Sequence, residues 1–353
     1  MSERLLRVIL LLITGVSVAS CASVGYYKQM LDGHLRLLDA REPIDELLTD
    51  QSIAPQLRSQ LEAVEEIREF AMTELLLPDN GSYRSYADLD RDFVTWNVVA
   101  TPELSLQPKA WCFWIAGCVN YRGYYKEESA EVFARQLRDR GYDVTVLGAS
   151  AYSTLGWFDD PVLNTMLGGS SISLARVIFH ELAHQKLYVS DSSAFNEAFA
   201  TFVADTGVEQ WLASTNRSDQ IVRFRLRNAR FLQFLKLLKN TQSRLTQVYT
   251  SAASTTVKRA KKIQVFNELN KDYARLRESW GNIPDYDAWF DRDLNNAHLA
   301  GISTYYDWVP AFAVMFADSG DFPAFYREAE RVGSLRPSVR KKMMRELALK
   351  YVK

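Results

Sequence analysis

Two histidines and a glutamate on one apolar stretch are the residues best suited to chemistry in this chain. His180, Glu181 and His184 lie within Arg176–Gln185, and they include two of the four histidines in the sequence. Residues four apart project from the same face of a helix, so both imidazoles can hold one metal ion. This spacing, with a carboxylate between the imidazoles, predicts a zinc site with Glu181 beside the metal.

The residues around this motif favour a buried helix. They are apolar at Val177, Ile178, Phe179, Leu182 and Ala183. A buried group of polar side chains without a ligand is costly, which favours metal binding. The alternative is an ordinary helix whose histidines pack in a core or face solvent.

A third ligand can be sought downstream, because catalytic zinc takes three protein ligands and leaves one position open. The segment Phe195–Phe202 has helical spacing of its apolar residues and follows a turn-like run at Ser190–Ser193. Glu197 can therefore face the first helix. The alternative is a carboxylate near a helix N-terminus that interacts only with the helix dipole.

The two motifs together resemble a known enzyme class. HELAH at 180–184 followed by NEAFA at 196–200 resembles the gluzincin metallopeptidases, and NEAFA is similar to the NEGFA form of zinc aminopeptidases. The resemblance implies one zinc ion held by His180, His184 and Glu197. It also implies that Glu181 is the general base for water that the metal activates.

Most of the chain also resembles a bacterial family of lipoprotein aminopeptidases. The likeness rests on the two zinc motifs and on Gly25-Tyr26-Tyr27, Trp111-Cys112, Gly117-Cys118, Asn295-Asn296-Ala297 and Trp308-Val309-Pro310. It implies a peptide or protein substrate.

Zinc peptidases also need a hydrogen-bond donor for the oxyanion of the tetrahedral intermediate. Zinc aminopeptidases use a tyrosine from beyond the ligand helix, and by that analogy Tyr305 is the first candidate, with Tyr306 and His298 behind it. The alternative for each tyrosine is interior packing.

Two further requirements leave several candidates open. An aminopeptidase needs an acidic group for the substrate ammonium, and Asp159, Asp160 and Asp191 are available. A histidine ligand usually donates its second N–H to a carboxylate or carbonyl. Asp205 lies too far along the helix from Glu197 to serve His180, and Thr201 is nearer but weaker.

The N-terminus predicts export and a lipid anchor. Residues 1–20 combine two arginines with a short apolar run, Val8–Val18, which is typical of a signal peptide. Val18-Ala19-Ser20-Cys21 resembles the lipobox of bacterial lipoproteins, which implies an acylated Cys21 held in a membrane. Ala22 after the cysteine favours the periplasmic face of the outer membrane. The alternative is a conventional secretory signal.

Outside the cytoplasm, Cys112 and Cys118 are candidates for a disulfide, with Gly117 available for a tight turn. Two buried free thiols are the alternative, because no further cysteine completes a zinc site.

Composition is that of a globular protein and excludes a dedicated nucleic-acid binder. The 353 residues are 47% hydrophobic, and 42 Lys and Arg against 43 Asp and Glu give a net charge of −1. A nucleic-acid binder would show a strong basic excess.

The expected fold class is α+β, mostly helical and zincin-like, with a small mixed sheet next to the HExxH helix and a long helical arm. After the signal peptide we expect an N-terminal helical region at 21–82, a catalytic α+β region at 83–212, a helical hairpin arm at 213–283 and a C-terminal helical region at 284–353. In gluzincins a strand before the zinc helix pairs with substrate, so Ser153–Trp157 is a candidate substrate edge or an ordinary sheet edge. The basic arm could touch anionic polymers or be a solvated helix face.

These observations favour a zinc-dependent metallopeptidase of the cell envelope, acting as an aminopeptidase. An envelope endopeptidase uses the same chemistry without an ammonium anchor. A non-catalytic zinc-fold scaffold is the third reading, and the presence of Glu181 weighs against it.

Overall fold

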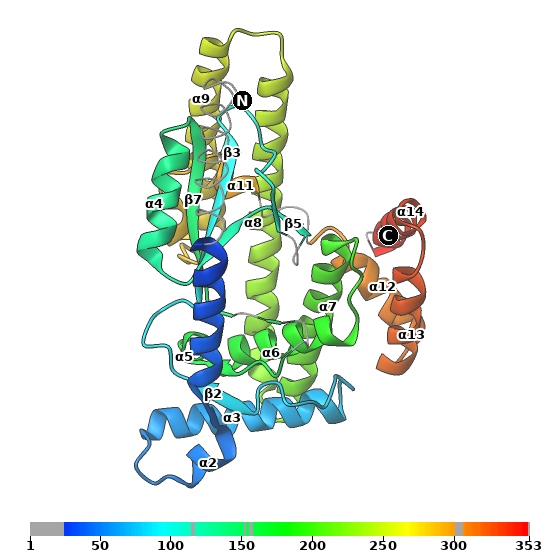
Figure 1. The fold of residues 1–353 in the computed structure, drawn as a ribbon. Coiled ribbons are helices and arrows are strands. Elements are labelled where there is room, and N and C mark those ends of the chain that lie inside the picture. Colours follow the sequence, from blue (N-terminus) through cyan, green and yellow to red (C-terminus); the bar gives the residue numbers. More distant parts are fainter. Residues whose placement is uncertain (1–24, 114–116, 152, 155–157, 301–305, 352–353) are drawn as a thin grey trace, which may run out of the picture.

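The computed structural model describes residues 25–113, 117–151, 153–154, 158–300 and 306–351. The signal peptide, Cys21, Tyr305 and residues 155–157 of the candidate substrate edge lie outside the described residues. The described chain is mostly helical with small sheets, as an α+β protein should be (Figure 1).

An antiparallel sheet occupies the middle of the molecule. It has the order β6-β3-β7, formed by β6 (Arg122–Tyr124), β3 (Thr95–Pro102) and β7 (Tyr142–Ala149). Helix α4 (Glu127–Arg138) packs on it because Ala130, Ala134 and Leu137 recur on one helical face and are buried with Val98 and Val144.

A second, mixed sheet leads into the helix that carries the histidines. It joins β1 (Arg41–Pro43), β2 (Ser85–Ala87) and β8 (Val162–Leu163), with β2 and β8 parallel. The chain then passes from β8 through α5 (Asn164–Leu167) directly into α6 (Ser171–Lys186). The mixed sheet therefore lies next to the HExxH helix.

A separate hairpin carries the two remaining cysteines. Cys112 on β4 (Trp111–Phe113) lies opposite Cys118 on β5 (Gly117–Val119), and a disulfide joins them.

Helix α7 (Ser193–Ser214) is the centre of the main core. It is apolar on nearly all sides, which is typical of a helix enclosed by other elements. Phe195 and Phe199 on α7 pack edge-on against Phe312 of α12 (Val309–Ser319). Helices α2 (Ile44–Thr49), α3 (Pro55–Thr73), α13 (Phe322–Gly333) and α14 (Pro337–Tyr351) complete this part, together with helical residues 25–39.

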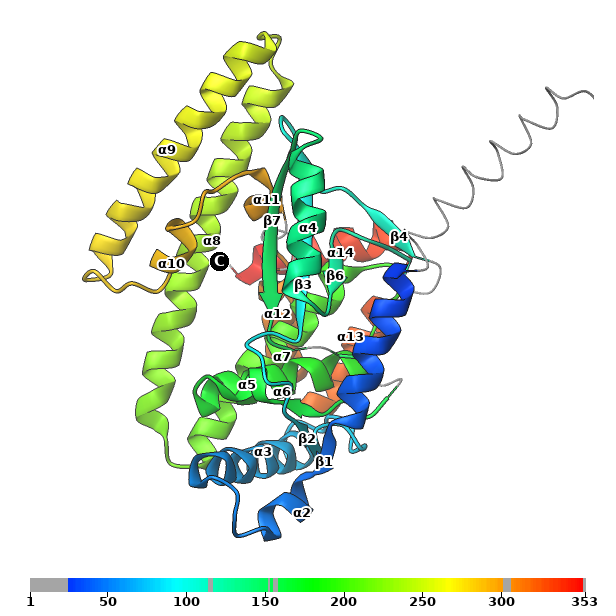
Figure 2. The same ribbon diagram turned by 60° about the vertical axis from the view of Figure 1, so that its left-hand side comes forward.

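Two long helices form an arm. Figures 1 and 2 show α8 (Ser218–Thr250) and α9 (Thr255–Ser279) side by side, with their turn projecting beyond the sheet. Many of the arm's cations are neutralised within the chain, through the ion pairs Arg225–Glu209, Arg230–Asp285, Arg244–Glu268 and Arg259–Glu103. These pairs weaken the case for a polyanion-binding surface on the arm.

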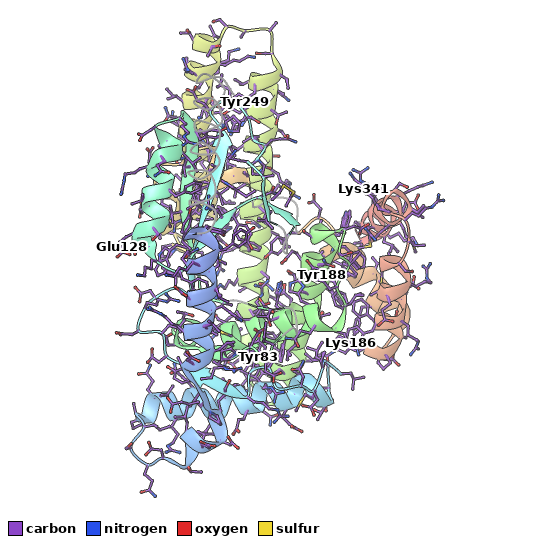
Figure 3. The ribbon with its side chains drawn as sticks, viewed as in Figure 1. Tyr83, Glu128, Lys186, Tyr188, Tyr249 and Lys341 are labelled. Atoms are coloured by element: carbon purple, nitrogen blue, oxygen red, sulfur yellow. A yellow bond between two sulfur atoms is a disulfide. The ribbon has the colours of Figure 1, made fainter. Side chains whose placement is uncertain are left out.

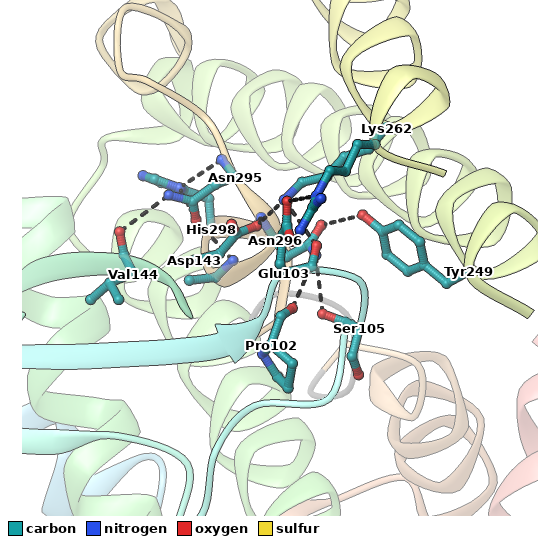
Figure 4. Close-up of polar contacts among 12 residues, drawn as sticks. Pro102, Glu103, Ser105, Asp143, Val144, Tyr249, Lys262, Asn295, Asn296 and His298 are labelled. Atoms are coloured by element: carbon teal, nitrogen blue, oxygen red, sulfur yellow. Dashed lines mark hydrogen bonds and ion pairs between the residues drawn. The ribbon is translucent and has the colours of Figure 1, made fainter. Parts of the chain in front are cut away.

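Asn296 joins the arm to the sheet (Figure 4). It is 0% exposed and begins α11 (Asn296–Ala300), a short helix that follows α10 (Asp287–Phe290). Its side chain donates to the carbonyls of Glu103 at 2.9 Å and Ser105 at 3.1 Å and accepts from the Tyr249 hydroxyl at 2.8 Å. Its backbone N–H bonds to Asp143, which also pairs with Lys262 of α9. One residue thus joins β3, β7 and both helices of the arm.

Among the described residues no helix is both long enough and apolar enough to cross a bilayer.

Candidate active site

His180, His184 and Glu197 converge at one point between α6 and α7. The Nε2 atoms of the two histidines lie 3.1 Å apart, and the Glu197 carboxylate lies 3.3 Å from His180 Nε2 and 3.6 Å from His184 Nε2. The ligand atoms of all three residues lie within 4.8 Å of one another. Two imidazoles and a carboxylate are a donor set suited to zinc.

Helix α6 fixes the two imidazoles. It begins where the Ser170 side chain accepts a hydrogen bond from the Ser173 N–H at 3.2 Å, and its apolar face buries Ile178, Phe179 and Leu182 in the core. Residues 180 and 184 are therefore left on the face that points to α7.

Asn196 positions Glu197. It is 1% exposed, accepts from the Val189 N–H at 2.8 Å and donates to the Val189 carbonyl at 2.9 Å. These two bonds fold the turn between α6 and α7 back onto the start of α7. The residue after Asn196 then faces the histidines, which gives the Asn-Glu pair a physical reason.

The C-terminal helices brace the same turn. Arg340 of α14 is 3% exposed, donates to the Gly333 carbonyl at 2.7 Å and forms an ion pair with Asp191 in the turn. Asp191 is therefore already engaged, which disfavours it as an anchor for a substrate ammonium.

The carboxylates differ in their surroundings. Burial alone would raise the pKa of Glu197, but hydrogen bonds from His180 and His184 lower it to about 2. Burial raises the pKa of Glu181, and the charge of Glu197 adds to the rise while the two histidines oppose it. Glu197 thus has the electrostatics of a ligand, and Glu181 those of a group that can take up a proton.

Among the described residues, few candidates remain to hydrogen-bond the second ring nitrogen of a histidine ligand. His184 Nδ1 is buried and has no hydrogen-bond partner there. Asp205 instead forms an ion pair with Arg176 at 2.6 Å. This agrees with the expectation that Asp205 lies too far along the helix from Glu197 to serve His180. Burial would lower the pKa of Arg176, but Asp205 outweighs it and raises the pKa.

The three candidate hydrogen-bond donors for the oxyanion differ in what the structure shows of them. Tyr305 lies outside the described residues. Tyr306 makes a side-chain hydrogen bond with Arg176, one helical turn before His180. His298 of α11 instead contacts Asn295, which lies just before this helix, and α11 packs against the sheet.

The expected substrate edge is wrong in its described part. Strand β7 ends at Ala149, and the residues Ser153 and Thr154 have no strand structure. The Thr154 N–H bonds to the Asp160 carboxylate at 2.9 Å, so it is not available to pair with a peptide. The Asp160 side chain thus accepts the backbone N–H that strand pairing would have used.

Asp160 and Asp159 therefore differ in exposure and in hydrogen bonding. Asp160 is 2% exposed, with its oxygens bonded by Ser153 and Thr154. Asp159 is exposed and lies directly over Gly81, where a Cβ would meet its carboxylate carbon at 2.3 Å. Of the three acidic candidates, Asp159 is the one left facing solvent without a described partner for its carboxylate.

Sequence reasoning missed the loop at 79–83. The Asn80 amide donates to Gln185 at 2.7 Å, and Gln185 lies one turn after Glu181 on α6. Pro78-Asp79-Asn80-Gly81 indicates only a break between helices, and no local signal shows which helix the loop will touch.

The chain was compared with known proteins. The family model described as "Putative aminopeptidase" matches residues 25–344. No curated protein and no solved structure matches the chain significantly. The match covers most of the sequence and includes both helices of the site, so this protein belongs to that aminopeptidase family.

Proposed function

We propose that this protein is a metallopeptidase of gluzincin type that binds one zinc ion and removes residues from the N-terminus of peptides. The observation that carries the proposal is the convergence of two imidazole nitrogens and one carboxylate within 4.8 Å. His180, His184 and Glu197 would hold the metal. When bound, zinc supplies Lewis acidity, which polarises the scissile carbonyl and acidifies water.

The chain's own residues perform the proton transfers. Glu181 takes the proton that the attacking water loses and passes it to the leaving amine. Its raised pKa brings proton uptake closer to neutral pH. Tyr306 is our candidate to donate a hydrogen bond to the oxyanion, because Arg176 holds its hydroxyl one turn from His180.

An exopeptidase also needs a group for the substrate ammonium. Asp159 is our candidate, since it is exposed above Gly81 in the loop that Gln185 anchors beside the site. Asp159→Asn should raise KM for peptides with a free N-terminus and leave cleavage of N-acetylated peptides unchanged.

We also propose that the protein is exported and held at the periplasmic face of the outer membrane by an acylated Cys21. The support is the lipobox-like sequence before Cys21 and the charged, apolar leader at 1–20. Mass spectrometry of the mature N-terminus tests this, because an unmodified Cys21 within an intact leader would contradict it.

The activity is tested with the full-length protein in detergent and a defined peptide mixture, with products identified by mass spectrometry. Stepwise loss of N-terminal residues, absent in Glu181→Gln, would establish an aminopeptidase. Internal cleavage that depends on Glu181 would assign an endopeptidase. Zinc-loaded wild type that is as inert as Glu181→Gln would contradict peptide hydrolysis and favour a scaffold.

A further inference from the structure

A layer of polar side chains lies along α6, next to Glu181. Gln185 donates to the Ser82 hydroxyl at 3.2 Å and accepts from Asn80 at 2.7 Å, while Arg68 holds the Asn80 carbonyl at 2.9 Å. Because Glu181 and Gln185 are four residues apart, the loop at 79–83 packs along their shared helical face.

Tyr83 ends this loop and carries an orphan hydroxyl. The residue is 1% exposed, and its hydroxyl has no hydrogen-bond partner among the described residues. Figure 3 shows Tyr83 beside α6, and besides burial, the charges of Glu181 and Asp160 act on its phenol and raise its pKa. An unsatisfied buried hydroxyl costs about 1–3 kcal/mol, so its presence calls for an explanation.

The backbone at Tyr83 is also held in an unfavourable conformation. Its φ of 61° lies in the left-handed region, which is uncommon for an aromatic residue. Its N–H bonds to the Asp160 carbonyl at 2.6 Å, which fixes the residue there. Strain of this kind persists where the surroundings over-determine it, and it concentrates at functional sites.

Ser153 completes the layer between two carboxylates. Its hydroxyl lies 3.3 Å from Asp160 Oδ2 and is also within hydrogen-bond reach of Glu181. Because the hydroxyl has one proton, it donates to one of these carboxylates at a time. Asp160 in turn holds Thr154 through its backbone N–H and its hydroxyl, both at 2.9 Å. Asp160 therefore fixes the backbone next to Ser153.

We propose that Tyr83 and Ser153 are positioning residues for Glu181. Ser153 donates its hydroxyl proton to the Glu181 carboxylate at rest, while Asp160 holds the neighbouring Thr154. The Tyr83 hydroxyl, which has no partner among the described residues, donates to that carboxylate as Glu181 shifts during proton transfer. In this proposal both residues act through Glu181 and not on the metal. The inference rests on the proposed function, in which Glu181 is the general base.

The test compares Tyr83→Phe with Tyr326→Phe in the full-length protein. Tyr326 is also buried, but its hydroxyl donates to the Leu75 carbonyl at 2.7 Å, so it is a satisfied counterpart. Loss of one positioning hydrogen bond should lower kcat of Tyr83→Phe about tenfold, with KM and bound zinc unchanged. In urea denaturation of the metal-free protein, Tyr83→Phe should be more stable than wild type and Tyr326→Phe less stable.

Ser153 provides a second variant with a conservative rescue. Ser153→Ala should lower kcat by a similar factor, and Ser153→Thr, which keeps the hydroxyl, should restore it.

Three outcomes overturn the inference. An active wild type with unchanged kcat in Tyr83→Phe and Ser153→Ala shows that Glu181 needs neither residue. Loss of zinc from Tyr83→Phe assigns it to metal binding. Destabilisation of metal-free Tyr83→Phe shows that the hydroxyl is already bonded at rest, for instance to a buried water. If wild type itself is inert, the proposed function fails first and the inference falls with it, which is a distinguishable result.

Discussion

The side chain of Asn196 holds the backbone of Val189 from both sides, accepting from its N–H at 2.8 Å and donating to its carbonyl at 2.9 Å. The six residues between the two helices, 187–192, are thereby closed into one defined turn. The position of Glu197 relative to His180 and His184 follows from this closure.

Asn196→Ala should therefore damage stability and metal binding together. The loss of two hydrogen bonds leaves the part-buried Val189 N–H without its acceptor, while the Val189 carbonyl keeps a bond from the Ser192 N–H at 3.1 Å. The substitution should therefore cost about 1–2 kcal/mol in urea denaturation. Zinc titration should show weaker binding. Thr201→Val, a buried substitution of equal size on the same helix, is the control for stability, and an equal loss in both variants would contradict a special role for Asn196.

Arg340→Met should destabilise the protein more than Asp191→Asn. The arginine is 3% exposed and serves two carbonyls as well as Asp191, so its removal leaves several groups unpaired, at a cost of about 3 kcal/mol or more. Asp191→Asn leaves an amide oxygen that can still accept, at a half-exposed position. Urea midpoints of the two variants test the order, and equal midpoints would contradict it.

Zinc should stabilise the folded protein. Because the candidate ligands converge only when α6 and α7 are packed, zinc should bind the native state. Free zinc at a thousand times its Kd would then add about 4 kcal/mol. Calorimetry with and without a chelator should show a fall in Tm on chelation for wild type and for Glu181→Gln, but not for Glu197→Ala. A Tm insensitive to chelation in wild type would argue against the site.

Acid should destabilise the protein through His298. Burial, with the nearby Arg292 charge, lowers the pKa of His298 to about 4, below its ordinary value of 6.5. The unfolded chain therefore binds more protons between these values, so stability falls as pH decreases from about 6.5 to 4, by about 2–3 kcal/mol in total.

Urea midpoints across this pH range provide the measurement. His298→Gln should flatten the profile between pH 4.5 and 7 while leaving other acid-sensitive groups in place. A profile with the same slope in the variant would assign the acid sensitivity elsewhere.

Reduction of the Cys112–Cys118 bond should have a small, local effect. The bond spans a sequence separation of 6, and closing so short a loop in the unfolded chain contributes about 2 kcal/mol. The double variant Cys112→Ala with Cys118→Ala should lose about this much stability and keep its zinc. Loss of zinc in that variant would show that the hairpin supports the site.

The sequence was sufficient for features that depend on local patterns. Helices at α6 and α7 follow from apolar spacing around the two motifs, although both extend beyond the predicted segments. The candidate ligands follow from residue type and helical spacing. Strands β3 and β7 overlap two runs rich in β-branched residues, 93–99 and 143–147, which are a local signal for strands.

Features that depend on distant contacts could not be predicted. The parallel pairing of β2 with β8 joins residues 86 and 162, and no pattern in either segment names its partner. The same holds for Tyr83, which approaches Glu181 only because Gln185 and Asp160 hold its loop. The predicted substrate edge was wrong in its described part because Asp160 accepts a hydrogen bond from the Thr154 N–H, and strand propensities do not predict such a bond.

The Asn296 junction imposes an order on folding. Its partners at Glu103, Asp143 and Tyr249 precede it by 193, 153 and 47 residues. As the chain emerges from the ribosome, N-terminus first, the sheet and the arm are both made before Asn296 is available to join them. Docking of the arm must await the last sixth of the polypeptide, and until then its apolar face, including Leu238 and Leu269, is open to chaperones.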